Sequence, residues 1–135
     1  MVSIKTLYYG IARAVKGICD KGYYQDRPSS VADRPGSYIV INFPSAIYNN
    51  EISEDGRYSD FETTVLIEIY IRDKMKAENP VEMDLVTMDD KVSKVMALFP
   101  ISTKDFVLKS PRVTFQASDG SGFHVTIIQG RLRTK

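Results

Sequence analysis

Hydrophobic and polar side chains alternate almost without interruption from residue 61 to residue 73. One set of alternate positions is Phe61, Thr63, Val65, Ile67, Ile69 and Ile71, and the intervening set is mostly polar or charged. A strict period of two predicts a half-buried strand, which at about 3.3 Å per residue would be roughly 43 Å long. Most strands end after five or six residues. We therefore expect part of this strand to extend beyond the domain's own core and to offer unpaired backbone groups to a neighbour.

Two segments show the three- and four-residue spacing of amphipathic helices. In the first, Ser3 is the expected N-cap and Gly22 the expected stop, and the apolar positions are Ile4, Leu7, Ile11, Val15 and Ile18. The second is predicted to begin at Asn79-Pro80, a cap followed by proline in the first turn. Its apolar positions are Val81, Leu85, Met88, Val92, Val95 and Phe99, and Pro100 follows.

The remaining segments predict strands and connections. Residues 23–36 contain two prolines and read as a long exposed connection. Residues 37–43 are apolar on both faces, as in a central strand, and Pro44 ends them. Residues 46–52 and 58–73 are predicted to form a hairpin around the turn at residues 54–57. Residues 113–117 and 123–132 are predicted to form a second hairpin around a glycine-containing turn.

The predicted order is helix, three strands, helix, two strands. Two amphipathic helices against one mostly antiparallel sheet make a two-layer α+β domain with the order α-β-β-β-α-β-β and an extended hairpin. The length of 135 residues indicates a single domain over residues 1–135. No apolar run approaches the ~18 residues that span a bilayer. The N-terminus lacks the features of a secretory signal, so we expect a cytoplasm-like compartment.

The charge is balanced, with 18 Lys and Arg against 17 Asp and Glu and a net charge of +1. This balance argues against a dedicated nucleic-acid-binding protein, which carries a strongly basic face. Basic residues nevertheless gather near the two ends of the last hairpin: Lys104, Lys109, Arg112, Arg131, Arg133 and Lys135. One interpretation is that these charges protect a sheet edge from uncontrolled pairing. The alternative, which is more specific, is that they form a patch that binds phosphates or acidic groups.

No residue pattern predicts a catalytic, cofactor-binding or metal site. Cys19 is the only cysteine and is expected to be a buried apolar residue. His124 is the only histidine, without a second histidine or an adjacent acid, and a structural role is expected. Glu62 and Glu68 share a strand face but lie roughly 20 Å apart by strand geometry. The glycines form no phosphate-binding pattern. We therefore predict that the chain is not an enzyme and has no cofactor.

Tyrosine is the other candidate for contact, since its ring supplies amphipathic contact area. The sequence leaves a position in the core and a position at an interface equally open for the following tyrosines: Tyr8, Tyr9, Tyr23, Tyr24, Tyr48, Tyr58 and Tyr70. We expect contacts between subunits at the hairpin tip and at the connection over residues 23–36. The candidate contact residues are Ile52, Asp55, Arg57, Tyr58, Tyr23, Tyr24 and Arg34.

The predicted elements are, in order, the N-terminal helix, residues 37–43, the extended hairpin ending at residue 73, the helix over residues 79–99 and the final hairpin. This order resembles that of the tail-terminator and tail-completion proteins of tailed bacteriophages. The resemblance covers almost the whole chain as a pattern and includes no diagnostic residue set. It implies a non-enzymatic virion protein of the tail or neck, assembled in the host cytoplasm.

The resemblance further implies a ring, with six subunits expected, that ends tail-tube growth and contacts the head-side connector. DNA would pass through its lumen without specific binding, and no membrane partner is implied. The alternative is a small ligand- or nucleic-acid-binding α+β domain that uses an open sheet face and the basic residues near the C-terminus. A third option is an enzyme with an unfamiliar site centred on His124.

Overall fold

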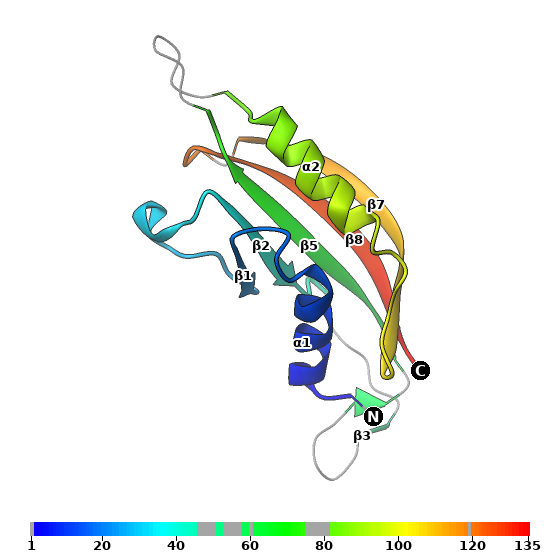
Figure 1. Cartoon of the computed structure of the whole chain (residues 1–135). Coiled ribbons are helices and arrows are strands. Elements are labelled where there is room, and N and C mark those ends of the chain that lie inside the picture. Colours follow the sequence, from blue (N-terminus) through cyan, green and yellow to red (C-terminus); the bar gives the residue numbers. More distant parts are fainter. Residues whose placement is uncertain (1, 46–50, 53–57, 60, 75–81, 119) are drawn as a thin grey trace.

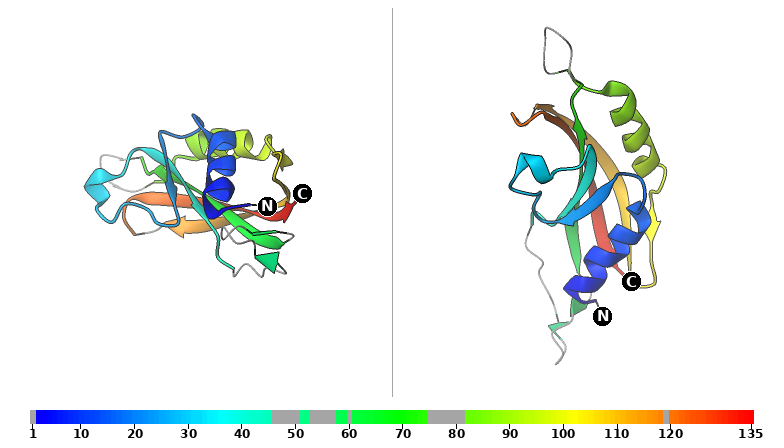
Figure 2. Two further views of the ribbon diagram at one scale, coloured as in Figure 1. Left: turned by 90° about the horizontal axis from the view of Figure 1, so that it is seen from below. Right: turned by 60° about the vertical axis from the view of Figure 1, so that its left-hand side comes forward.

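Six strands form one curled sheet, and both α-helices pack on the same face of it (Figures 1 and 2). The computed structural model describes residues 2–45, 51–52, 58–59, 61–74, 82–118 and 120–135. The elements in chain order are α1 (Ile4–Val15), β1 (Lys21–Tyr24), the 3-10 helix η1 (Val31–Asp33), β2 (Ser37–Asn42), β3 (Glu51–Ile52), β4 (Tyr58–Ser59), β5 (Glu62–Arg72), α2 (Leu85–Met96), β6 (Ile101–Ser102), β7 (Phe106–Ser118) and β8 (Phe123–Thr134).

The strand order in the large sheet is β1-β2-β5-β8-β7-β6. The predicted α+β class is confirmed. The sheet is mixed, because β1 pairs parallel with β2, whereas the other neighbours in it pair antiparallel. β3 and β4 form a separate two-stranded sheet in which Ile52 lies opposite Tyr58, so this part of the predicted first hairpin is confirmed. The described part of the chain contains no helix long and apolar enough to cross a membrane.

The long alternating strand is central, which corrects the prediction of an overhang. All eleven residues of β5 pair with β8, from Glu62 opposite Arg133 to Arg72 opposite Phe123. β2 pairs with the second half of β5 only, from Leu66 to Ile71. The helix side of β5 is buried even where β2 is absent, since Thr63, Val65 and the preceding Phe61 are at most 8% exposed. The last hairpin is longer than predicted, and it provides the partner for the whole of β5.

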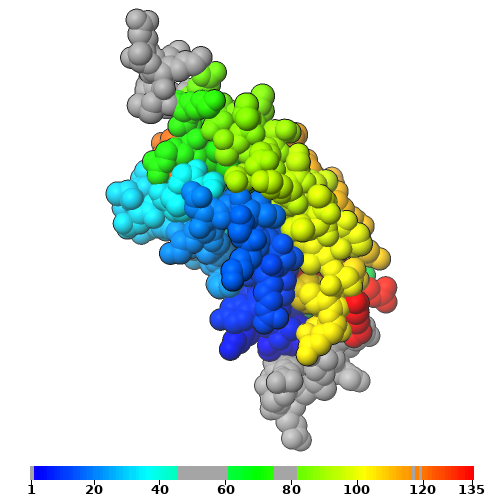
Figure 3. Space-filling model, viewed as in Figure 1, coloured from blue at the N-terminus to red at the C-terminus, as the bar shows by residue number. Residues whose placement is uncertain are grey.

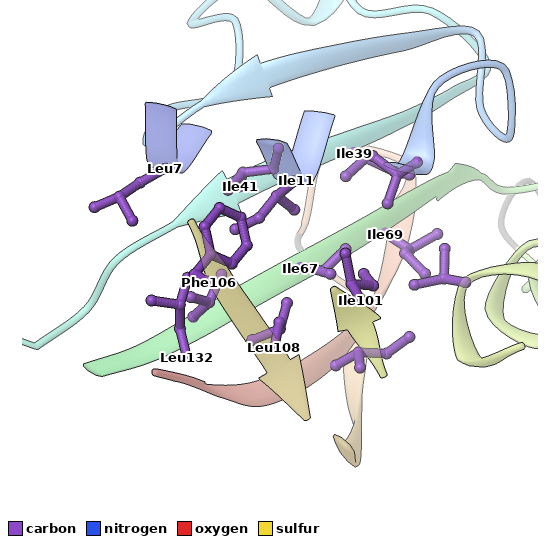
Figure 4. Packing of buried hydrophobic residues seen from close by; sticks show 14 of the residues in the cluster. Leu7, Ile11, Ile39, Ile41, Ile67, Ile69, Ile101, Phe106, Leu108 and Leu132 are labelled. Carbon is purple, nitrogen blue, oxygen red and sulfur yellow. The ribbon is translucent and has the colours of Figure 1, made fainter. Parts of the chain in front are cut away.

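The main core lies between this sheet and the two helices (Figure 4). Leu7 and Ile11 of α1 and Met88 of α2 pack against the apolar side chains of β2, β5 and β8. Full burial of each such side chain contributes about 1.5–3 kcal/mol. A smaller cluster lies on the opposite face, formed by Tyr38, Val40, Tyr70, Phe123 and Val125.

One observed helix end, the N-cap of α1, is the one predicted from the sequence, and the other three helix ends differ from the prediction. The hydroxyl of Ser3 accepts from the Thr6 backbone N–H at 3.1 Å, so the predicted N-cap of α1 is confirmed. α1 ends at Val15 rather than near Gly22, because Gly17 adopts a φ of +83°. Ile4 is 56% exposed and does not belong to the buried stripe.

α2 begins at Leu85, whereas the sequence predicted a start at Asn79, which lies outside the described residues together with Pro80. Asp84 is the observed N-cap, and its carboxylate accepts from the Thr87 N–H at 3.1 Å and from the Thr87 hydroxyl at 2.8 Å. These hydrogen bonds lower the pKa of Asp84. The helix also ends at Met96, before the predicted Phe99.

Residues 23–36 were predicted to be an exposed connection, and this prediction is wrong in part. Tyr23 and Tyr24 belong to β1, and η1 interrupts the rest. The connection folds over one end of the helix-free face, where the Arg27 guanidinium lies 5.6 Å from the centre of the Tyr70 ring. Its side chains therefore help to bury the smaller cluster.

Gly130 of β8 allows Leu108 and Phe99 to pack directly over the strand. A Cβ atom at this position would lie 2.7 Å from Leu108 Cδ1 and 3.2 Å from Phe99 Cε2. We expect Gly130→Ala to lower the free energy of unfolding in urea by about 1–3 kcal/mol, because these neighbours must shift. Gly22→Ala on β1 is the control, since the nearest atom, the Ile39 carbonyl oxygen, lies 3.9 Å away. Equal stability of the two variants would contradict this packing argument.

Candidate functional site

The structure places the predicted contact residues in different surroundings. Ile52 and Tyr58 pair through their backbones in the small hairpin, and Asp55 and Arg57 lie outside the described residues. The Arg34 side chain is buried at 7% exposure. It donates to the Pro28 carbonyl oxygen and to the Ser121 hydroxyl, each at 2.8 Å. Arg34 therefore anchors the connection over residues 25–36 within its own subunit, and its role between subunits stays a prediction.

Tyr23 and Tyr24 lie on β1, the strand at one edge of the sheet. The Tyr23 ring packs edge-to-face on Tyr38 with 5.6 Å between ring centres. Tyr24 is 47% exposed, and its ring lies 5.2 Å from that of Tyr8 and 5.9 Å from that of Tyr9. Tyr23 thus belongs to the smaller core cluster, whereas Tyr24 belongs to an aromatic group at the surface.

A groove of about 560 Å³ lies between α1 and β1, next to this aromatic group. Ile39 and Ile41 contribute apolar walls, together with Ala12 and Val15. The lining also contains the charged residues Arg13, Lys16, Asp20 and Lys21. The groove is therefore apolar inside, with more basic than acidic residues around it.

Cys19 also lines the groove. Burial raises the pKa of its thiol to about 11, against a smaller lowering by a hydrogen bond with Ser37. The nucleophilic thiolate is therefore scarce at neutral pH. Cys19 packs against the main core and is half-buried, which agrees with the expected apolar role more than with a reactive thiol.

The opposite edge of the sheet has an open strand. β6 pairs with β7 at Val107 and Leu108, so among the described strands the outer edge of β7, opposite to β8, is unpaired from Lys109 to Ser118. Two register shifts interrupt its pairing with β8, and Pro111 lies in the first of them. Bulges, proline and charged residues discourage uncontrolled pairing at an edge. Phe115, between the two shifts, is nevertheless 72% exposed.

The start of α2 is a second exposed apolar feature. Leu85 is 65% exposed and Val86 is 76% exposed. α2 contacts β5 and β8 through its buried side. Phe115 lies opposite the buried Thr126 in the β7–β8 register, which places it on the helix side of the sheet. Figures 1 and 2 show the start of α2 and the end of β7 at the same end of the molecule.

A buried polar pair lies where β5 ends and β8 begins. His124 Nδ1 is 2.5 Å from Asp73 Oδ1, and the side chains are 19% and 2% exposed. Asp73 Oδ2 is buried without a hydrogen-bond partner in the described part of the chain. The Asp73 N–H donates to the Gly122 carbonyl oxygen at 2.8 Å. The sequence showed no acid beside His124, because Asp73 is 51 residues away along the chain.

An Asp–His pair can activate a nucleophile when a hydroxyl or thiol lies within reach. Ser118 lies opposite His124 in the β7–β8 register, but its hydroxyl accepts from the Gly120 N–H at 3.2 Å. Neither the α1–β1 groove nor the polar groove described below is lined by His124 or Asp73. In the described part of the chain, the contacts of the pair link the end of β5 to the start of β8. Among the described residues no group of three or more His, Cys, Asp and Glu could hold a metal ion.

The helix-free face carries a basic group at the β7–β8 end of the sheet. Lys109 lies directly opposite Arg131, and Arg133 is on the same face. Arg112 and Arg131 line a polar groove of about 760 Å³ with Thr64, Ser110 and Gln129. Glu62 contributes a carboxylate 3.5 Å from Arg131 Nη2 and 4.0 Å from Arg133 Nη1. Lys109, Arg112, Arg131 and Arg133 are called the cationic face below.

The structure thus brings together four of the six basic residues that the sequence singled out. Lys104 lies in the turn between β6 and β7. Lys135 Nζ donates to the Ser102 hydroxyl of β6 at 2.6 Å. Sequence reasoning missed the α1–β1 groove, the exposed start of α2 and the His124–Asp73 pair. The groove and the pair each bring together residues far apart in the sequence, and the exposure of Leu85 and Val86 follows from where the helix begins.

A comparison with protein-family models finds no match, and a comparison with curated proteins finds none either. The fold is similar to that of a chain in a solved structure of the virion of a native gene transfer agent (GTA) particle. The TM-score is 0.50, the sequence identity is 13%, and the match covers 95% of this chain and 90% of that chain. At this identity the likeness shows that the two chains share a fold over nearly their whole lengths.

We predict that the His124–Asp73 pair stabilises the subunit. In a double-mutant cycle, Asp73→Ala and His124→Ala are each expected to cost about 1–3 kcal/mol of unfolding free energy, with a coupling energy of at least about 1 kcal/mol. The exposed pair Glu62–Arg131 is the control, with a coupling below about 1 kcal/mol. Urea denaturation of the single and double variants measures both cycles. Equal coupling energies in the two cycles would contradict the stabilising role of the His124–Asp73 hydrogen bond.

Proposed function

We propose that this chain is a structural subunit of a phage-like virion, and more specifically a tail-terminator or tail-completion subunit that forms a ring where tail meets head. The observation that carries the proposal is the shared fold with a chain of the GTA virion over 95% of this chain. The order of elements predicted from the sequence, which resembles that of tail-terminator proteins, is the reason for the more specific assignment. On this proposal the chain makes and breaks no covalent bond.

The described surfaces suit a subunit that assembles. The two edges of the sheet are different, with β1 beside an apolar groove on one side and the open part of β7 on the other. A ring requires one surface to bind a different surface of the next copy. Two different edges on one subunit supply the two surfaces that such a contact needs.

We expect native mass spectrometry of the purified chain at micromolar concentration to show a closed oligomer of one defined size, with six subunits as the expected number. Negative-stain electron microscopy should show annular particles of the same sample. A subunit that stays monomeric at every accessible concentration would overturn the ring. A continuous ladder of sizes would indicate open polymers instead.

A second candidate function is binding of nucleic acid by the cationic face, and the observation that favours it is the groove lined by Arg112 and Arg131. Arginine, threonine, serine and glutamine side chains contact phosphate oxygens in protein–DNA complexes. This reading treats the chain as a binding domain. It does not require a ring.

If the cationic face binds DNA, affinity should fall with salt at a slope of about −0.9 in log K per phosphate neutralised. Arg112→Ala and Arg131→Ala should each reduce that slope by about 1 in fluorescence-anisotropy titrations. Lys94→Ala is the matched control, because Lys94 lies on α2 and pairs with Asp90 at 3.1 Å. A slope near zero, or an equal effect of all three substitutions, would remove this candidate.

A further inference from the structure

Most of the exposed large apolar side chains among the described residues lie on two pairs of elements, α1 with β1 and α2 with β7. Ile4, Tyr9 and Tyr24 are 56%, 42% and 47% exposed and lie on α1 and β1. Leu85, Val86 and Phe115 are 65%, 76% and 72% exposed and lie on α2 and β7. We call these groups surface A and surface B. Val31 of η1, at 42%, belongs to neither.

The fold separates these two surfaces across the sheet. Surface A lies at the β1 edge. Surface B lies toward the other edge, with Phe115 on β7 and the start of α2, a helix that packs over β5 and β8. The space-filling view shows α1 and α2 as separate regions of one side of the molecule (Figure 3). Two different apolar surfaces on one subunit favour a head-to-tail contact, in which A of one copy meets B of the next.

The charges around the two surfaces are complementary. α1 carries Lys5 and Arg13 and no acidic residue, and Lys16 and Lys21 follow it beside the α1–β1 groove. Asp20 is the one acidic residue among the described residues that line this groove. Residues 82–94 carry four acids and two bases, an excess of acids: Glu82, Asp84, Asp89 and Asp90 against Lys91 and Lys94. Lys74 pairs with Asp84 and Lys94 pairs with Asp90, so the start of α2 is only weakly acidic. A basic patch that meets an acidic patch guides the approach and fixes the register of a contact.

The groove supplies space for an apolar side chain from the neighbour. Its volume of about 560 Å³ lies within the roughly 300–1,000 Å³ range of clefts that bind small ligands. Tyr9 and Tyr24 line it beside Ile39 and Ile41. Interface energy concentrates where apolar or aromatic anchors fill such pockets. The first turn of α2 presents two adjacent exposed apolar residues, Leu85 and Val86, flanked by acids.

We propose that the start of α2 in one copy of this chain docks into the α1–β1 groove of the next copy, so that surface B contacts surface A. This inference rests on the proposed ring and names the surfaces that build it. Leu85 and Val86 enter the groove, and the acids of residues 82–90 face Arg13, Lys16 and Lys21. Phe115 extends the same contact along β7.

Two variants test the contact from its two sides. Val86→Asp places a charge on surface B at a 76% exposed position in the first turn of α2, where a negative charge suits the helix N-terminus. The double variant Arg13→Glu with Lys16→Glu reverses the charge beside the groove. Each is expected to weaken self-association at least tenfold. Lys104→Glu in the β6–β7 turn is the control and should assemble as the unchanged protein does.

Mixing the two variants is the sharpest measurement. Their remaining intact surfaces can form one contact per pair of subunits, so the mixture should give a 1:1 dimer and nothing larger by native mass spectrometry. Thermal unfolding followed by circular dichroism checks that each variant is folded. Full assembly of either variant alone, or a mixture that stays monomeric, would overturn the A–B contact. If the unchanged chain itself stays monomeric, the proposed ring fails and the contact fails with it.

Discussion

The pairing of β5 with β8 is the interaction on which the rest of the structure depends. Eleven residues of β5 are in register with β8, and on their helix side Ile67 lies opposite Ile128. Because a shift by one residue would move every apolar side chain of a strand to the other face, this register also fixes where both helices can pack. β2 and β7 then join the two outer sides of the pair, and the His124–Asp73 hydrogen bond links one of its ends.

Placing both helices on one face has a direct consequence for function. Among the described residues, Arg34 and Arg27 hold residues 25–36 over the Tyr38 cluster at one end of the other face. The remainder presents the cationic face, with Lys109 opposite Arg131. The sheet edges also differ, since α1 and β1 enclose a groove while β7 runs past the end of the short β6. The surfaces available for contact therefore follow from the topology.

Local signals in the sequence predicted local structure well. The alternation over residues 61–73 predicted β5, and Ser3 predicted the cap of α1, because both depend on neighbours in the chain. Asn79-Pro80 gave a plausible helix start, yet Asp84 is the observed cap, since several residues in this stretch could cap a helix and burial of Met88 and Val95 decides among them. β1 escaped prediction because four mostly exposed residues carry little pattern. The groove and the His124–Asp73 pair need tertiary contacts that no local pattern encodes.

Although the net charge is only +1, acidic and basic residues are concentrated in different parts of the chain. Acids collect at residues 82–90, whereas bases collect on α1 and in the residues that follow it, and again on the cationic face. A near-neutral chain with separated charges repels copies of itself weakly overall and attracts them in one orientation. On the proposed A–B contact, this pattern would orient one copy against the next. It also explains why total charge argued against nucleic-acid binding while one face of the folded chain remains suited to phosphate.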